Sequence, residues 1–463
     1  GALRFRSVVS EPMVGAPPAA ISRAGAPKLR ARQLRPLGRE WLVARQGWLG
    51  FAGVILTGTL IVLSAAHTFL LLPASIRPLP NSYAGAFGQG GIDLGLGGMV
   101  AVLALMFVSY VAMVRGVRQL TARPVLIGIA CLNLLVLLGP PLLSTDVFSY
   151  VAYGRIGRVY GSNPYLYGPN AFMFDPLYPL IGAQWVKTPT AYGPLFTALS
   201  YLLAPLTIAA QVIVYKTIAA ISSVMIVLVV WSSARLRDMN PVKAVAIVGL
   251  NPVIVIYGVG GGHNDLLMLA ISLVAVYVLL QQKQRTSGAL IMAAAAVKLT
   301  AGLMLPFALA QGAGEPTGPD RRRALLIGAG VTAAVLAIFS FATFGTGPLH
   351  LLGTLQKIQA SGGLHSIYGL LLEPFHSAEL FTIAGFVADA VLLVCLAWLV
   401  RRVWTGQLDW IRGAGWGTVA MIGTASLLVP WYVAWLVPLA ALSRDRRLLA
   451  VTVVLSGLAL TTL

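Results

Sequence analysis

Residues 209–233 read AAQVIVYKTIAAISSVMIVLVVWSS, a run in which Lys216 is the one charged side chain. A helix of about 25 residues spans roughly 37 Å, enough to cross the ~30 Å hydrocarbon core of a bilayer. Similar apolar runs occur at 49–73, 93–114, 124–143, 242–260, 265–281, 287–310, 324–345, 378–400, 414–442 and 448–463. They lack the alternation of membrane strands, so we expect an all-α polytopic membrane protein.

Composition supports the same fold class. The chain of 463 residues is 58% hydrophobic and 10% charged, with a mean hydropathy of +0.83, whereas a soluble domain keeps about a quarter of its residues charged. Residues 49–463 are therefore expected to form one transmembrane domain. Cys131 and Cys395 each lie inside an apolar run, where a small hydrophobe packs well, so no disulfide framework or metal cluster is indicated.

The net charge of +19 comes from short cationic clusters between apolar runs, a pattern of membrane topology rather than of nucleic-acid binding. We place these clusters in the cytoplasm, with a basic tail over residues 1–48 that is expected to be disordered or to lie on anionic lipid. The clusters are Arg115/Arg118/Arg123, Arg235/Arg237/Lys243, Lys283/Arg285, Arg321/Arg322/Arg323, Arg401/Arg402 and Arg444/Arg446/Arg447. Residues 144–208 then form an outer loop with juxtamembrane helices.

The same charge rule applies to three ambiguous segments. A full crossing by 191–208 would move the cluster that begins at Arg235 outside, so we expect this segment to lie along the interface or to enter without crossing. Segments 287–310 and 414–442 each have cationic loops before and after them, so we expect both to turn back as broken or re-entrant helices. The expected break points are Lys298 with Pro306, and Pro430.

The densest polar group begins where the third apolar run ends. Asp146 and Tyr150 lie four residues apart and would share one surface of a helix with Tyr153, while Arg155 and Arg158 follow on the next turn. A carboxylate beside an apolar exit point gains basicity from partial desolvation, which makes Asp146 a candidate functional acid or base. The alternatives are an N-cap role for Asp146 and lipid-headgroup binding by the arginines.

A second polar group closes the glycine-rich stretch 257–265 at the end of another span. Glycines let the backbone approach a ligand closely. His263 can donate to phosphate or sugar oxygens, and Asn264 and Asp265 can accept from sugar hydroxyls. A glycine turn with Asp265 as N-cap of the next helix explains the same residues equally well.

Four further residues complete the candidate set. Lys298 interrupts an apolar run, either as a phosphate ligand or as a side chain that reaches the interface. His365 lies in an expected outer loop, and Trp431 and Tyr432 follow Pro430, where aromatics bind sugar or anchor the interface. The chain has no metal-site spacing, no P-loop and no nucleophile elbow, so ATP-driven transport and covalent serine chemistry lose support.

These motifs together resemble a known family. The run Asp146 to Tyr165, the segment TAYGPL at 190–195, GHND at 262–265 and VKL at 297–299 are similar to the polyprenol-phosphomannose-dependent α-1,6-mannopyranosyltransferases of actinobacteria. That family belongs to the glycosyltransferase C superfamily, and the likeness spans about residues 45–460. It implies a glycosyltransferase C type helical bundle with outer juxtamembrane helices.

The resemblance also implies a reaction. Asp146 would act as general base on the acceptor hydroxyl, with inversion from a β-linked donor to an α product. Charge on the departing phosphate would be stabilised by candidates that we list as Arg155, Arg158, His263 and Lys298. One departure is that many superfamily members show two acids close together near the first outer loop, whereas this motif contains Asp146 alone.

The implied partners are a polyprenyl phosphomannose donor, a mannan glycolipid acceptor and membrane lipids, without nucleic acid, cofactor or metal. The implied setting is lipomannan or lipoarabinomannan assembly at the plasma membrane, with the active site on the non-cytoplasmic side. A transporter or flippase for a lipid-linked saccharide is the alternative. It is disfavoured because we detect no inverted repeat in the sequence.

Overall fold

The computed structural model describes residues 37–64, 83, 85–86, 91–312, 318–361, 366–375 and 377–461. Contacts divide the chain between Leu42 and Val43, and the compact unit Val43–Leu463 contains the features described below. Every regular element in the described part is helical, which confirms the expected fold class. Of the expected basic tail, residues 37–48 belong to the first helix and the rest lies outside the described residues.

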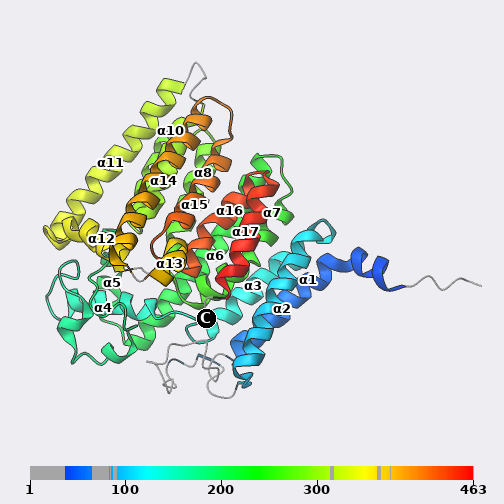
Figure 1. Ribbon diagram of the computed structural model, residues 1–463, viewed down its shortest axis with the longest axis horizontal. Helices are drawn as coiled ribbons and strands as arrows, with labels where there is room; N and C mark the ends of the chain where they lie inside the picture. The colour runs from blue at the N-terminus through cyan, green and yellow to red at the C-terminus, as the bar shows by residue number, and fades with distance from the viewer. Residues whose placement is uncertain are drawn as a thin grey trace, which may run out of the picture. The chain divides into compact units, whose positions relative to one another are not determined.

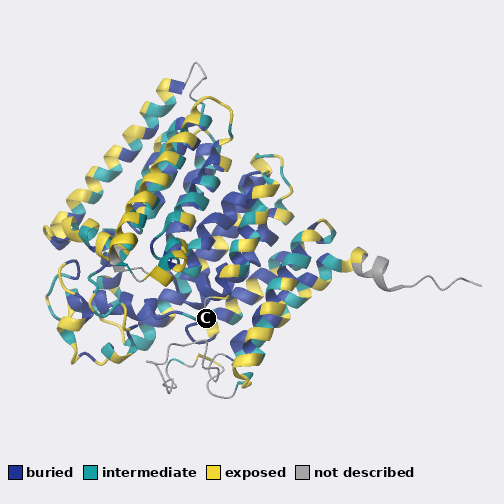
Figure 2. Ribbon diagram, in the orientation of Figure 1, coloured by how far each residue is buried: buried dark blue, intermediate teal, exposed yellow. Residues whose placement is uncertain are grey.

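Five helices among the described residues are long and apolar enough to cross a membrane. They are α1 (Leu37–Ser64), α2 (Gly95–Arg115), α6 (Ile208–Leu236), α11 (Gly318–Phe344) and α14 (Ala378–Trp404). Figure 2 shows α11 and α14 exposed along much of their length, although both are apolar. Such surfaces suit a lipid solvent, which is as apolar as the side chains themselves.

A further span is broken near its middle. Helix α7 (Pro241–Gly249) and the π-helical segment η6 (Val253–Gly260) meet at an angle of 54°. Pro252 cannot continue the hydrogen-bond ladder of α7. Asn251 occupies the break, and its side chain makes three hydrogen bonds within the protein. A polar break is tolerated at this depth because protein groups satisfy it.

Shorter helices complete the bundle. They are η3 (Val117–Gln119), α3 (Ala122–Leu138), α8 (Asp265–Leu280), α9 (Gln284–Ala295), η7 (Leu299–Leu303), α10 (Met304–Ala310), η8 (Gly347–His350), α12 (Leu351–Ser361), α13 (Ile367–Leu372), η10 (Glu373–Phe375), α15 (Trp410–Thr424), η11 (Pro430–Tyr432), α16 (Val433–Leu442) and α17 (Arg446–Ala459). Several of them are apolar but too short to meet the length expected of a full membrane span.

Segments 287–310 and 414–442 both turn back, as the charge rule predicts. Helix α9 runs antiparallel to α8 and ends at Ala295, shortly before Lys298, and the chain then returns through η7 and α10. In the second segment, α15 and α16 are joined through η11. An ion pair of 2.6 Å between Arg412 and Asp445 ties the start of α15 to the start of α17, so both ends of this segment lie on one side.

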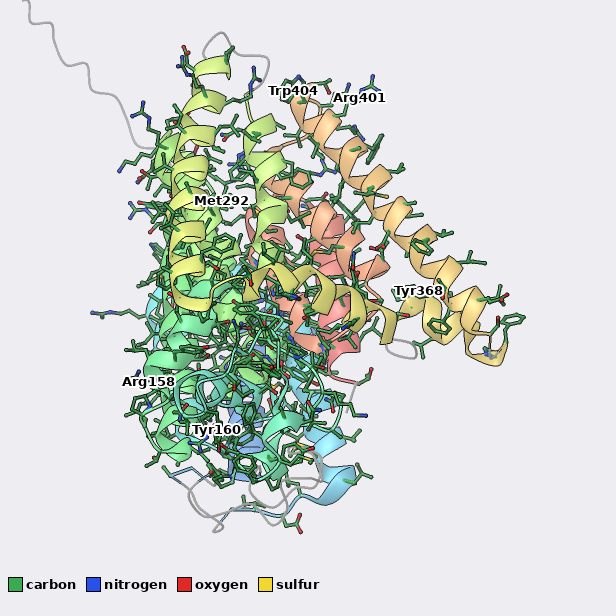
Figure 3. All side chains as sticks on the ribbon, turned by 90° about the vertical axis from the view of Figure 1, so that its left-hand side faces the viewer. Arg158, Tyr160, Met292, Tyr368, Arg401 and Trp404 are labelled. Carbon is green, nitrogen blue, oxygen red and sulfur yellow. The ribbon has the colours of Figure 1, made fainter. Side chains whose placement is uncertain are left out.

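The cationic turns gather at one end of the bundle. An ion pair of 3.1 Å joins Arg237, after α6, to Asp409, before α15, and Arg444 donates to the carbonyl oxygen of Arg237. Figure 3 shows Arg401 at that end and Arg158 toward the opposite end. These cationic turns therefore lie at the end of the bundle away from Arg158.

The expected outer loop forms a separate layer of short helices: α4 (Asp146–Arg158), η4 (Pro169–Phe172), η5 (Tyr178–Leu180) and α5 (Pro194–Leu203). With about 1.5 Å of rise per residue, α5 is far too short to cross a bilayer. It packs against α4 instead, where a Cβ on Gly154 would lie 2.2 Å from the carbonyl oxygen of Ser200. Figure 1 shows α4 and α5 together beneath the spans.

Candidate active site

A cavity of about 350 Å³ lies where the outer layer meets the bundle. Its polar end contains Asp146, Tyr153 and Lys298, which come from α4 and from the link between α9 and η7. Much of the remaining wall is apolar and includes Leu355 of α12 and Leu392 of α14. The cavity thus combines a polar, ionisable end with an apolar wall.

Asp146 is held at the cavity by its neighbours in the chain. It is the first residue of α4, whose N-cap is Thr145, so the alternative of an N-cap role for Asp146 is wrong. Lys216 donates to the carbonyl oxygens of Val136, Gly139 and Pro140 and thereby closes the end of α3. This arrangement fixes the turn that leads into α4 and leaves the Asp146 side chain 7% exposed and free to face the cavity.

Burial also changes the acidity of this carboxyl group. It raises the pKa of Asp146 to about 7, partly offset by the positive charge of Lys298. A carboxylate is normally a weak base near neutral pH, and desolvation strengthens it because the charged form loses hydration. Asp146 is therefore suited to accept a proton from a ligand in the cavity.

Lys298 and Asp265 form the charged pair of the site. The Lys298 ammonium lies 2.8 Å from Asp265 Oδ1, and the indole N–H of Trp435 donates to the same oxygen at 2.8 Å. The alternative of Asp265 as N-cap of α8 is wrong, because the N-cap is Asn264 and its side chain makes no capping bond. The rings of Tyr432 and Trp435 lie 5.3 and 5.2 Å from the ammonium.

His263 lies behind the cavity wall. Its ring stacks on Trp431 at 4.0 Å and its Nδ1 is 3.6 Å from Asp146 Oδ2, while Trp431 itself lines the cavity. Burial lowers the pKa of His263 to about 3, so the imidazole is neutral. The preceding glycines pack against protein: a Cβ on Gly260 would lie 2.6 Å from Leu142.

The two predicted tyrosines have different positions. Tyr153 lines the cavity and donates to the carbonyl oxygen of Thr188 at 3.1 Å. Tyr150 is fully buried behind the wall, where its hydroxyl donates to Asn264 Oδ1 at 3.4 Å. Asn264 and Asp265, both predicted to accept from sugar hydroxyls, are buried and outside the described lining, whereas Tyr432 is part of it.

Two other predicted residues lie elsewhere. Arg155 forms an ion pair of 2.8 Å with Asp175, away from the described cavity lining. Arg158 is exposed and also outside this lining (Figure 3). His365 lies outside the described residues. The structure therefore brings Asp146, His263 and Lys298 together and separates the two arginines from them.

Sequence analysis missed several lining residues. Trp185 and Thr188 come from the irregular part of the outer layer, where no periodic pattern marks them. Tyr192 lies within the TAYGPL segment that carried the family resemblance, but it was not singled out as a site residue. Asp389 also lines the cavity. It could have been recognised from the sequence, because it is an acid within an apolar run. Within the described part of the chain, no group of three His, Cys, Asp or Glu side chains could hold a metal ion.

Comparison with known proteins agrees with this architecture. The family described as "Alpha-(1->6)-mannopyranosyltransferase, N-terminal domain" matches residues 48–313, and the "MptB C-terminal domain" matches residues 359–463. Alpha-(1->6)-mannopyranosyltransferase A of Mycobacterium tuberculosis is 30% identical over 68% of this chain and 64% of its own length. Its namesake in Corynebacterium glutamicum is 27% identical over 65% of this chain and 66% of its own length.

The chain thus spans slightly less than two thirds of the length of these relatives. No solved structure matches it. Because the first family match covers more than half of its residues, the chain belongs to the alpha-(1->6)-mannopyranosyltransferase family.

Proposed function

We propose that this chain is an inverting mannosyltransferase. It moves mannose from polyprenyl phosphomannose to a hydroxyl of a mannan glycolipid and forms an α-1,6 linkage, as in lipomannan and lipoarabinomannan assembly. The names of the relatives support the sugar and the linkage. The observation that carries the proposal is the buried carboxylate of Asp146 at the polar end of a largely apolar-walled cavity.

The proposed step is a single displacement. Asp146 accepts the proton of the acceptor hydroxyl as the acceptor oxygen bonds to the anomeric carbon. The bond from that carbon to the donor phosphate breaks, and its electron pair stays on the phosphate oxygen. Attack opposite the phosphate inverts the carbon. A positioned base is needed because a sugar hydroxyl is a weak nucleophile while it keeps its proton.

Lys298 is the second member of the proposed machinery. It is the only cationic side chain among the described lining residues. A cation is needed because negative charge grows on the phosphate as the sugar leaves. A cation held in a poorly hydrated site stabilises such charge effectively. The apolar wall that includes Leu355, Leu392 and Met421 suits an isoprenoid chain, which gains free energy when it leaves water.

We place the site on the non-cytoplasmic side of the plasma membrane. The cationic turns lie at the end of the bundle opposite the outer layer, and such turns favour the cytoplasm. A transporter would instead place its polar substrate groups near the bilayer midplane. Asp146 lies at the boundary between α3 and the outer layer, which favours an enzyme over the transporter alternative.

The test uses purified protein in nanodiscs with polyprenyl phosphomannose and a short α-1,6-mannan acceptor. Release of polyprenyl phosphate and growth of the acceptor by one mannose are expected, with the new linkage identified by NMR. Asp146→Asn should slow both signals by about 10²- to 10⁴-fold. Asp175→Asn is the control for replacing a buried carboxylate outside the lining, and its folding is checked by thermal unfolding because it also weakens the ion pair with Arg155. A folded wild-type protein that releases no polyprenyl phosphate would contradict the proposal.

A further inference from the structure

His263 occupies an unusual position between two acids. Its Nδ1 lies 3.6 Å from Asp146 Oδ2 and 3.9 Å from Asp265 Oδ2, both just beyond hydrogen-bond distance. Gly262 has φ of +66°, a left-handed conformation that favours glycine and turns the chain just before the ring. The ring is thus held by the backbone turn and by the stacked Trp431.

The polar atoms of this ring lack hydrogen bonds. Both nitrogens of His263 are buried without a hydrogen-bond partner, and so is Asp265 Oδ2 beside them. Leaving buried polar groups unpaired destabilises a protein, so a native structure normally satisfies them. A small movement of the Asp146 carboxylate, by about 0.7 Å, would bring it within the ~2.9 Å typical of an N–H···O bond.

We propose that His263 is a positioning residue that acts through Asp146. Its neutral Nδ1–H donates to Asp146 Oδ2 when substrate fills the cavity, so that Oδ1 is aimed at the acceptor hydroxyl. This inference rests on the proposed function, because it assumes that Asp146 is the base. It replaces the direct contact with donor phosphate that the sequence suggested for His263.

Three observations favour this role over a phosphate contact. Trp431 covers the ring, and His263 is absent from the described lining of the cavity. The ring is also neutral, whereas Lys298 on the lining offers a full positive charge. His263 is therefore poorly placed to meet the donor and well placed to orient the carboxylate.

Removal of the N–H should change the acidity of Asp146. A hydrogen bond to a carboxylate favours its charged form, so its loss raises the pKa. The other groups that act on the acidity of Asp146, namely Lys298, Asp265 and the hydroxyl of Ser144, would remain. The same holds for the surrounding tyrosines, whose own acidity depends on the charge of Asp146: Tyr150, Tyr153, Tyr192 and Tyr432. The rise of activity with pH should therefore move to higher pH in a variant without the donor.

The experiment compares His263→Leu, which removes the donor, with His263→Asn, whose amide can occupy the Nδ1 position. For His263→Leu we expect kcat to fall about 10- to 100-fold, consistent with loss of orientation, while the donor KM stays within about twofold of wild type. The acid limb of the pH profile, over which activity rises with pH, should move to higher pH. His263→Asn should recover most of the activity. His263→Gln, whose amide extends toward the Nε2 position, is a second loss variant should His263→Leu fold poorly.

His350→Leu is the matched control, because His350 is exposed and outside the described lining. A raised donor KM with unchanged kcat in His263→Leu would overturn the inference in favour of a phosphate contact. Equal losses in all three His263 variants, with an unmoved acid limb, would overturn it in favour of packing alone. If the wild type is inactive, the proposed function is overturned together with this inference. If the wild type is active, either of the two results above overturns the role of His263 and leaves the proposed function standing.

Discussion

Replacing Asp146 by Asn tests the chemistry most directly. The amide keeps the shape of the carboxylate in a buried position but cannot accept the acceptor proton. Loss of a general base typically lowers kcat by about 10²- to 10⁴-fold, which corresponds to about 3–5 kcal/mol in the activation free energy. The donor KM should change little, because the ammonium of Lys298 stays paired with Asp265.

The pH dependence of wild-type turnover gives a second, independent test of Asp146 as the base. Burial raises the pKa of Asp146 to about 7. The base works only when ionised, so activity is lost as pH falls through about 7. Ionised fractions of roughly one tenth at pH 6 and nine tenths at pH 8 predict about ninefold higher turnover at pH 8. The residual activity of Asp146→Asn should lack this limb.

As pH rises, ionisation of Asp146 should lower the stability of the protein while it raises the activity. A folded-state pKa above the unfolded value of 3.8 means that the ionised form disfavours folding. The stability of the wild type therefore falls between pH 4 and 7 through this group, and by linkage the loss is at most about 4 kcal/mol. Asp146→Asn avoids this loss, so its melting temperature at pH 8 should equal or exceed that of the wild type.

Single-turnover transfer from radiolabelled donor, with thermal unfolding in the same nanodiscs, provides both measurements. Asp175→Asn controls for replacing a buried carboxylate elsewhere. The reasoning would be refuted if Asp146→Asn kept wild-type turnover. A melting temperature well below wild type at pH 8 would also refute it, because the activity loss would then come from misfolding.

Three further outcomes are expected. Lys298→Met should raise the donor KM at least about tenfold, as expected for loss of one buried charge contact, and Lys187→Met at an exposed site should not. Lys216→Met should lower the free energy of unfolding by about 2–4 kcal/mol, measured by thermal unfolding, because carbonyl oxygens at the end of α3 lose their donor. In His263→Leu, which cannot form the hydrogen bond to Asp146, the acid limb of kcat at saturating donor should lie at higher pH than that of kcat/KM, since a bound phosphate raises the pKa of Asp146.

Much of the fold was predictable because span length and loop charge act locally along the chain. The charge clusters predicted that 287–310 and 414–442 turn back, and the structure shows both reversals. Asp146 and Lys298 could be singled out because an ionisable side chain beside or within an apolar run is costly. Both line the same cavity.

The partners of these side chains could not be predicted, because they come from distant parts of the chain. Asp265 meets Lys298 only after α8 and α9 pack antiparallel. Arg155 follows Asp146 in sequence, yet it turns to Asp175 and leaves the site. Such pairings depend on tertiary packing, which a single sequence without an alignment does not encode in any local pattern.

The break points were nevertheless the best guide to the site. A helix that ends inside a membrane exposes backbone groups, which must be satisfied by protein or by a water-filled cavity. Lys298 and Pro430, predicted as breaks from polarity and proline alone, both lie at or beside the cavity, and η6 ends just before His263. Pro306, predicted as part of the first break, instead lies within the first turn of α10, where a proline is tolerated. Interrupted spans converge at the cavity because the cavity and its polar side chains satisfy their ends. The same interruptions bring a base and a cation next to an apolar wall. The cavity therefore both satisfies the backbone groups at the helix ends and holds the side chains that the proposed reaction requires.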